Sequence, residues 1–316
     1  MAQRILIALG AGLAAGVLFV LPTKGMMAGI WLSVLAPMPL MIACMGYGLV
    51  VGLGAAIIGA CLAAIFQPAL GLTFLITTAF PALLLAWLAR HVFGGLRLSP
   101  GYVLTAVAAL SIIAVWGTVA FAAVSYGGLD VAARELAASV ATVLKNLRGV
   151  EDAADVMPVE EFSSLVVASM PAMLAFWSIL ALSLNLWLAA RVTMISGRFG
   201  ETWPDLPTHL FLPRSALAAF ALATLACAPP GVTRVFASSA AVALCVAFSL
   251  QGLTAIHRLT MGRQGRAGIL LALYVVMFLL FPLPLFVMAG VGVADNVKPL
   301  RRSLPKPTPT NLSDNH

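Results

Sequence analysis

Nine apolar segments without a charged residue dominate this chain and limit what it can fold into. Most are close to the ~20 residues that an α-helix needs to cross the hydrocarbon core of a bilayer. Backbone groups in lipid must be paired within the protein, so such segments cross as helices. The sequence therefore predicts an all-α fold, a polytopic transmembrane helical bundle with eight to nine membrane segments. The segments are 5–21, 26–43, 46–66, 69–89, 103–124, 162–190, 215–228, 235–250 and 268–293.

The composition of the whole chain supports the same class. Its 316 residues are 62% apolar and 9% charged, with a mean hydropathy of +1.05. Soluble proteins carry about 45–50% apolar and roughly 25% charged residues. These values exclude a cytosolic enzyme, a disordered scaffold and a nucleic-acid-binding domain, so the lipid bilayer is the expected partner. The first segment is followed by Leu21-Pro22 rather than a small-residue cleavage site, which predicts a retained helix.

The cysteines, histidines and glycines predict no cofactor, metal or catalytic centre. No Cys-x-x-Cys pair occurs, and the histidines lack partners at metal-ligand spacing. The hydrolase elbow, the Walker A loop and the His-Glu-x-x-His motif are absent from the sequence. We therefore expect no enzyme. The cysteines, expected as buried apolar side chains, are Cys44, Cys61, Cys227 and Cys245.

Prolines predict where three segments deviate from a simple crossing. Pro37 and Pro39 should break the second segment, since proline removes a backbone donor. The seventh segment is short and ends at Pro229, which favours a re-entrant segment. Pro282 and Pro284 should divide the ninth segment into two half-helices.

Positive loop charge predicts an inner-membrane protein with a cytoplasmic N-terminus. If every segment crosses, nine positive charges fall on the side of the N-terminus. A ninth full crossing would place Lys298, Arg301, Arg302 and Lys306 on the opposite side, against the rule. Either the last segment returns, or another segment does not cross. The nine charges are Arg4, Arg90, Arg97, Arg191, Arg198, Arg214, Arg258, Arg263 and Arg266.

We expect one domain over residues 1–297 and a disordered polar tail over 298–316. A hydrophilic excursion at 127–161 interrupts the domain, and its apolar residues recur every three or four positions. That spacing favours an amphipathic helix at the outer interface, with a substrate-covering lid as the alternative. Pro158 followed by two glutamates is typical of a helix start.

Small residues at helical spacing predict close helix packing. Gly48, Gly52 and Gly59 share one helical face, and Gly12 and Gly16 share another. Small residues three or four positions apart let helices approach closely in a membrane. The alternative is that the glycine backbone lines a substrate cavity.

A polar pocket is predicted from the few polar side chains at membrane depth, each of which is costly in lipid. Asn185 and Ser178 lie seven residues apart on one face, with Trp177 nearby, and Gln251 ends the eighth segment. These four residues are the candidate substrate-binding set. The alternative is that Asn185 holds helices together, with Gln251 and Asp295 as interfacial residues.

Several short motifs recur in the order expected of a known family. They are Pro37 and Pro39 ahead of a Gly-rich third segment, Trp203 and Pro213 before the seventh segment, Gln251-Gly252, and a terminal Gly292-x-x-Asp295 followed by Arg301-Arg302. On these residues the chain resembles the YybS-like family of uncharacterised bacterial membrane proteins, which have no agreed biochemical activity.

The Pro-rich second segment followed by glycines is also similar, more distantly, to the S components of energy-coupling-factor transporters. That likeness implies a bound vitamin or metal ion and a partner module with ATPases. This chain departs from it by having eight or nine segments rather than six, and by offering no matching docking motif.

Two functions of different classes follow. The first is solute binding or transport, with a cavity between the sixth and eighth segments. The second is a non-transporting membrane factor that binds partner proteins or lipids through its interfacial helix and basic loops. A membrane enzyme is the weakest hypothesis, because no acid–base pair or nucleophile cluster occurs. A cavity within the bilayer would favour the first function, and solid packing the second.

Overall fold

The computed structural model describes residues 1–24, 27–92, 99–148, 158–199, 205–298 and 300. Within these residues the secondary structure is helical, without a strand, which confirms the all-α prediction. Trp203, Arg302 and nearly all of the predicted tail at 298–316 lie outside the described residues. The helices are α1 (Ala2–Val20), α2 (Met27–Ser33), α3 (Pro37–Tyr47), α4 (Leu49–Phe66), α5 (Pro68–Phe74), α6 (Phe80–His91), α7 (Pro100–Ser125), α8 (Leu129–Arg148), α9 (Val159–Ile195), α10 (Leu206–His209), α11 (Arg214–Ala226), α12 (Val232–Leu259), α13 (Arg266–Leu279) and α14 (Leu283–Val297).

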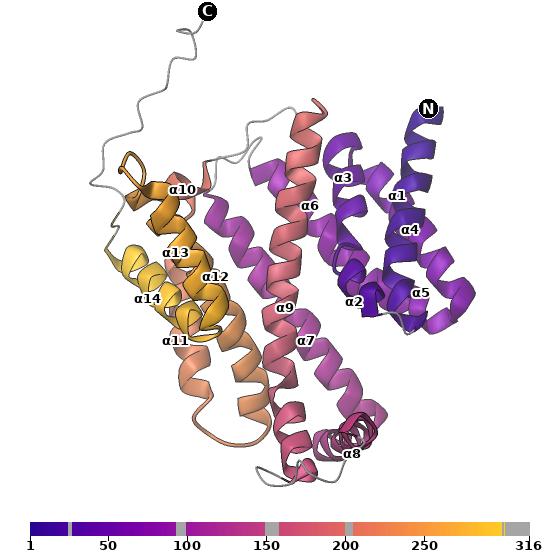
Figure 1. Cartoon of the computed structure of the whole chain (residues 1–316). Helices are drawn as coiled ribbons and strands as arrows, with labels where there is room; N and C mark the ends of the chain where they lie inside the picture. The colour runs from indigo at the N-terminus through magenta and orange to yellow at the C-terminus, as the bar shows by residue number, and fades with distance from the viewer. Residues whose placement is uncertain (25–26, 93–98, 149–157, 200–204, 299, 301–316) are drawn as a thin grey trace, which may run out of the picture.

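Seven helical segments in the described part of the chain are long and apolar enough to cross a membrane. Three further apolar helices, α11, α13 and α14, have 13 to 15 residues each and are too short to do so alone. The first six predicted segments and the eighth therefore correspond to spans. The ninth becomes the two short helices α13 and α14. The seventh becomes the short helix α11, which still runs from the end of the bundle where α9 ends to the end where α12 begins (Figure 1). The spans are Ala2–Thr23, Ala28–Tyr47, Leu49–Phe66, Pro68–His91, Pro100–Ser125, Val159–Ile195 and Val232–Leu259.

The long helix α9 stands at the centre of the bundle, with α1–α6 on one side and α10–α14 on the other (Figure 1). Its 37 residues extend for about 55 Å, well beyond the ~30 Å hydrocarbon core. Helices α3, α7 and α12 all contact it. Helix α9 is therefore longer than a crossing of the hydrocarbon core requires.

Prolines mark the predicted break at Pro37 and the predicted helix start at Pro158, and Pro81 adds an irregularity that the sequence did not predict. Helix α2 ends at Ser33 and α3 begins at Pro37, so the second span is broken. A π-turn at Leu75–Ala79 precedes Pro81 in the fourth span, because this proline cannot donate a helical hydrogen bond. Helix α9 begins at Val159, directly after Pro158, with two glutamates in its first turn.

The ninth segment forms a hairpin rather than a full crossing. Helix α13 ends at Leu279, Pro282 lies in the turn, and α14 runs back alongside α12 (Figure 1). Asn296, near the end of α14, hydrogen-bonds to Leu212, close to the start of α7. Both ends of the hairpin therefore lie at the same end of the bundle. This return brings Lys298 to the same end of the bundle as the N-terminus, whereas Arg301, Arg302 and Lys306 lie outside the described residues.

Arginines collect at this end of the bundle, which we call the basic end. The ends of α3, α6 and α9 meet here: Arg90 donates to Met45 O (3.1 Å), and the guanidinium of Arg198 lies 5.1 Å from the Tyr47 ring centroid. Helices α1 and α13 begin here, and α12 ends here (Figure 1). The arginines on these helix ends and on the adjoining turns are Arg4, Arg90, Arg191, Arg198, Arg258, Arg263 and Arg266.

Helix α8 lies across the opposite end, as the amphipathic pattern predicts (Figure 1). It packs on α7 and α9 through buried Ala132 and Ala141. Lys145 is joined to Glu160 at the start of α9 by a 2.8 Å ion pair, with both side chains exposed. Exposed pairs of this kind contribute little stability. Helix α8 is therefore held mainly by its small apolar contacts.

Small residues form the contact between α1 and α4. A Cβ on Gly12 would overlap the Ala55 carbonyl oxygen, and one on Gly16 would lie 2.9 Å from the Gly59 carbonyl oxygen. Gly52 faces a different neighbour, with Cys44 Cβ and Leu83 Cδ2 at 2.9 and 2.7 Å from a built Cβ.

The structure gives Gly48 another role than the packing predicted for it. This glycine lies between α3 and α4 at φ = 98°, with nothing within 4 Å of a built Cβ. It turns the chain in a conformation that residues with a side chain rarely adopt.

Candidate functional site

A short non-helical segment, residues 210–213, runs through the interior of the C-terminal helices. Leu210 and Leu212 are buried, so their backbone groups need partners within the protein. Gln251 Oε1 accepts from Leu212 N (2.9 Å), and Asn296 Nδ2 donates to Leu212 O (2.8 Å). Ser99 Oγ lies 3.2 Å from Phe211 O. Polar side chains from α12, α14 and the start of α7 therefore stabilise this segment.

Gln251 also joins α12 to α14. Its Nε2 donates to Gly292 O (3.1 Å) and to Asp295 Oδ2 (3.2 Å), and both side chains are fully buried. The two helices cross without intervening side chains: a Cβ on Gly252 would overlap the Met288 carbonyl oxygen. Gln251, Gly252 and Asp295 thus belong to one structural contact.

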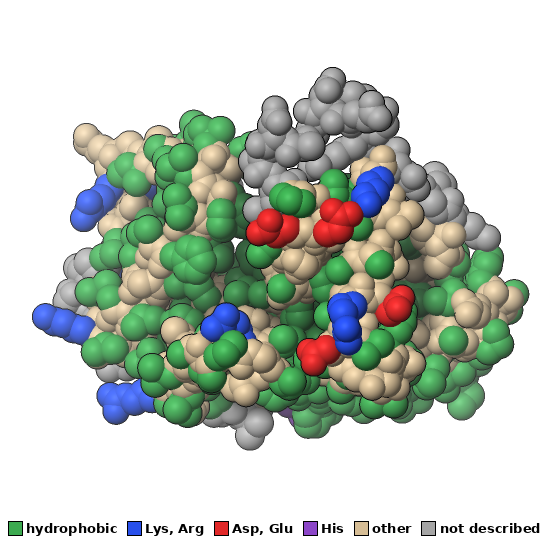
Figure 2. All heavy atoms as spheres, turned by 90° about the horizontal axis from the view of Figure 1, so that it is seen from below, with side chains coloured by type: hydrophobic (Ala, Val, Ile, Leu, Met, Phe, Trp, Pro, Cys, Tyr) green, Lys and Arg blue, Asp and Glu red, His purple; other side chains and the backbone are tan. Residues whose placement is uncertain are grey.

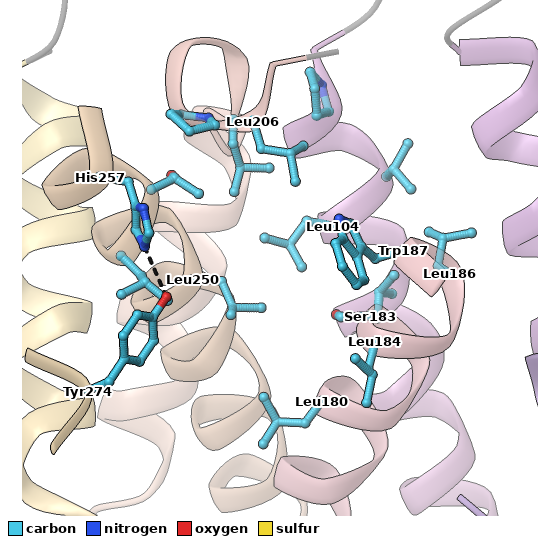
Figure 3. Close-up of a pocket in the computed structure, with 17 residues that line it drawn as sticks. Leu104, Leu180, Ser183, Leu184, Leu186, Trp187, Leu206, Leu250, His257 and Tyr274 are labelled. Atoms are coloured by element: carbon cyan, nitrogen blue, oxygen red, sulfur yellow. Dashed lines mark hydrogen bonds between the residues drawn. The ribbon is translucent and has the colours of Figure 1, made fainter. Parts of the chain in front are cut away.

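A pocket of about 620 Å³ lies beside this contact, between α7, α9, α10, α12 and α13 (Figure 3). It lies between α9 and α12, which correspond to the sixth and eighth predicted segments. The solute-binding hypothesis predicts its cavity between the same two segments. Its wall is mostly apolar. Representative lining residues are Leu104, Leu180, Leu186, Leu206, Leu250 and Leu253.

The polar groups of the pocket lie on opposite walls. His257 Nε2 and Tyr274 Oη form a 2.9 Å hydrogen bond that joins α12 to α13 (Figure 3). Across the pocket, the Ser183 hydroxyl points inward from α9 beside Trp187, and it is buried without a hydrogen-bond partner (Figure 3). Thr254 instead donates to Gln251 O (2.7 Å).

Asn185 lies outside the pocket lining and hydrogen-bonds to a carbonyl oxygen at the break in the second span. Its Nδ2 donates to Val34 O and to Ala181 O, both at 2.7 Å. Pro37 has no N–H, and Met38 N bonds to Leu35 O, so Val34 O has no helical donor. The amide supplies that donor. Asn185 Oδ1 has no hydrogen-bond partner.

Ser178 and Trp177 also lie outside the pocket lining. Ser178 Oγ donates to Ser111 Oγ of α7 (3.2 Å). Trp177 is half exposed and forms edge contacts with Trp31 and Phe176. The structure therefore does not gather the four predicted binding residues: Asn185 and Gln251 bond to different elements.

The candidate binding set predicted from the sequence contains none of the pocket residues Ser183, Trp187, Thr254, His257 and Tyr274. The spacing of Ser183 and Trp187, four residues apart on α9, contains a usable signal because such residues share a helix face. Tyr274 carries no comparable signal. It meets His257 only because α13 folds back on α12.

Comparison with known proteins gives one family. The sequence model described as "Predicted membrane protein (DUF2232)" matches residues 14–296. No curated protein and no solved structure matches the chain.

Proposed function

The chain belongs to the family of predicted membrane proteins (DUF2232), and from that premise we propose that it is a membrane-embedded binding protein for a lipophilic solute. The observation that carries the proposal is the apolar pocket between α9 and α12. Pockets for small ligands usually measure about 300–1,000 Å³ and combine apolar walls with a few placed polar groups. This pocket has both features.

The position of the pocket supports a ligand that resides in one leaflet. Its lining on α12 extends from Leu250 to His257, about 10 Å of helix rise, which is less than half of the hydrocarbon core. His257 lies near the end of α12 at the basic end. The proposed solute therefore occupies the leaflet next to the basic end.

We propose transport of the solute as the more specific function. We propose, from the sequence resemblance to S components of energy-coupling-factor transporters alone, that a partner ATPase module drives release of the solute. The apolar lining favours a lipophilic solute over a polar vitamin or a metal ion. His257 and Tyr274 are the titratable residues of the lining, so we propose binding rather than catalysis.

A photoactivatable test addresses the pocket directly. A diazirine-bearing hexadecanol, incubated with the protein in nanodiscs, should crosslink to lining peptides of α9 and α12. Leu253→Trp should reduce that crosslinking severalfold by filling the pocket. Leu271→Trp is the matched control, since Leu271 is 66% exposed on α13. Crosslinks spread evenly over lipid-facing helices, unchanged by Leu253→Trp, would contradict the proposal.

We propose further that the basic end faces the cytoplasm of a cell with an inner membrane, since loop arginines favour that side. Single cysteines at Arg198 and Arg263 should resist an impermeant thiol reagent applied to intact cells. A cysteine at Arg134 on α8 should react. Labelling at Arg198 in sealed cells would reverse the proposed orientation.

A second candidate function is partner binding at the α8 end. The observation that favours it is the set of charged side chains on the face seen from below, over α8 and the start of α9 (Figure 2). Asp130, Arg134 and Glu135 are exposed there. A photocrosslinker at Glu135 should capture a partner protein in cells, and a crosslinker at Leu271 serves as the lipid-facing control. Lipid adducts alone at both positions would count against this function.

A further inference from the structure

We infer that the pocket exchanges its solute sideways with the bilayer, through a portal between α9 and α13, and that Tyr274 positions α13 at this portal. The inference rests on the proposed binding function and adds the route by which the solute enters. The exposed part of the lining, the depth of that part in the bilayer and the light packing of α13 support it.

The exposed part of the lining belongs to α9 and α13. Of the described residues that line the pocket, Leu184, Trp187 and Tyr274 are the exposed ones, with relative exposures of 47%, 42% and 46%. Leu184 and Trp187 lie on one wall and Tyr274 on the other (Figure 3). The lining that α7 contributes is buried, as at Leu104 and Val107. The pocket therefore opens between α9 and α13.

The portal has an edge at each end. Phe281, in the turn after α13, packs on Phe176 of α9 with ring centroids 5.5 Å apart. The lining begins one helical turn further along α9, at Leu180. At the basic end, Leu206 and Pro207 of α10 belong to the lining. Both ends of the opening are therefore bounded by protein, and the opening faces sideways.

The portal lies just below the lipid headgroups of the leaflet next to the basic end. Arg191 of α9 is exposed, and its guanidinium lies 5.8 Å from the Trp187 ring centroid. Arginine and tryptophan side chains near helix ends gather at the interface between membrane and water. Leu184 precedes Arg191 by two helical turns, about 10 Å of helix rise, which places it among the acyl chains. A solute dissolved in that leaflet therefore meets the portal directly.

Helix α13 is the lightly packed side of the portal. None of its residues, all of which the structure describes, is buried, whereas α9 has buried residues such as Ile179 and Leu186 beside the pocket. The 2.9 Å hydrogen bond between Tyr274 Oη and His257 Nε2 joins α13 to α12. Segments with few buried contacts open at a low cost in free energy. This hydrogen bond therefore sets how readily α13 moves away from the pocket.

The diazirine-bearing hexadecanol tests the route when its crosslinking is followed in time. The probe is added from vesicles to the protein in nanodiscs, and light flashes at successive delays trap it. Crosslinks to the α4 peptide that contains exposed Val50 report arrival of the probe in the bilayer. Crosslinks to the α12 lining report entry into the pocket, and entry should lag behind arrival.

Tyr274→Phe should shorten this lag severalfold, because it removes the hydrogen bond to His257 and keeps the ring. The final level of α12 crosslinking should stay the same, since the lining remains. Tyr102→Phe is the matched control, because Tyr102 is an exposed tyrosine of α7 outside the lining. An equal lag in these two variants would overturn the role of Tyr274.

Two exposed leucines of α9 test the opening itself. Leu184→Trp should lengthen the lag severalfold, because the larger side chain narrows the portal. Leu174→Trp should leave the lag unchanged, since Leu174 is 49% exposed on the same helix but lies outside the lining. Equal lags in the two variants, zero included, would overturn the portal while α12 crosslinking still showed binding. Absence of α12 crosslinking at every delay would instead remove the binding function.

Discussion

The helices on the two sides of α9 are held together in different ways. The contacts of α1 with α4, and of α4 with α3 and α6, are made through Gly12, Gly16, Gly52 and Gly59. On the other side, α12, α14 and the buried segment 210–213 are joined by side-chain hydrogen bonds as well as by a glycine crossing.

This difference follows from backbone regularity. A regular helix pairs its own backbone groups, so its neighbours need only fit closely. An extended segment inside the bundle leaves backbone donors and acceptors that side chains must satisfy. The irregular side is also the side with the pocket, since residues next to the extended segment form part of its wall.

Gly292→Ala should cause the largest loss of stability, and it tests the close crossing of α12 and α14. The added Cβ would overlap the Phe248 carbonyl oxygen, and backbone cannot rotate away as a side chain can. We expect a loss of about 3 kcal/mol or more, at the upper end of overpacking. Thermal unfolding in detergent measures it. Gly290→Ala on the same helix, with nothing within 4 Å, should be neutral; equal effects would refute the close crossing.

Gly52→Leu tests the side held by small residues. The new side chain meets Leu83 and Cys44, of which Leu83 can partly move, so we expect a loss of about 2–3 kcal/mol. Leu53→Ala should cost much less, because Leu53 is 47% exposed. Unchanged thermal stability of Gly52→Leu would mean that this face is not a contact.

Gln251→Leu tests whether the extended segment depends on its amide partner. The substitution leaves Leu212 N without its acceptor and removes both bonds to α14. Hydrogen bonds between membrane helices average about 0.6 kcal/mol, so three suggest a loss of roughly 2 kcal/mol. Gln67→Leu at an exposed position is the control. If Gln251→Leu and Gln67→Leu were equally stable, residues 210–213 would not depend on the Gln251 side chain.

Asn185→Leu should cause the smallest loss of stability, about 1 kcal/mol. The substitution removes the one hydrogen bond that α9 donates to the Val34 carbonyl oxygen. Hydrogen exchange at residues 34–38 should increase near the break between α2 and α3. Increased exchange throughout α12 instead would show that Asn185 and Gln251 act in one network after all.

Local chemistry made parts of the fold predictable. The length of an uncharged run compared with the bilayer thickness predicts the spans, and the prolines predict the break before Pro37 and the division of the ninth segment at Pro282. That the two halves form a hairpin was one of two alternatives that the sequence left open. The helix start after Pro158 and the amphipathic α8 follow from residues that lie close together in the chain. None of these features requires a distant partner.

The tertiary structure decided what the polar side chains do. Asn185 lies 151 residues from Val34 in the chain, and Gln251 lies 39 residues from Leu212. The cost of a buried amide predicts that each finds a partner, but it does not identify a backbone carbonyl exposed by a proline elsewhere. The pocket is a still longer-range property, since it exists only where α7, α9, α12 and α13 meet around a non-helical segment. Sequence spacing describes one helix at a time, whereas a cavity depends on the space between several.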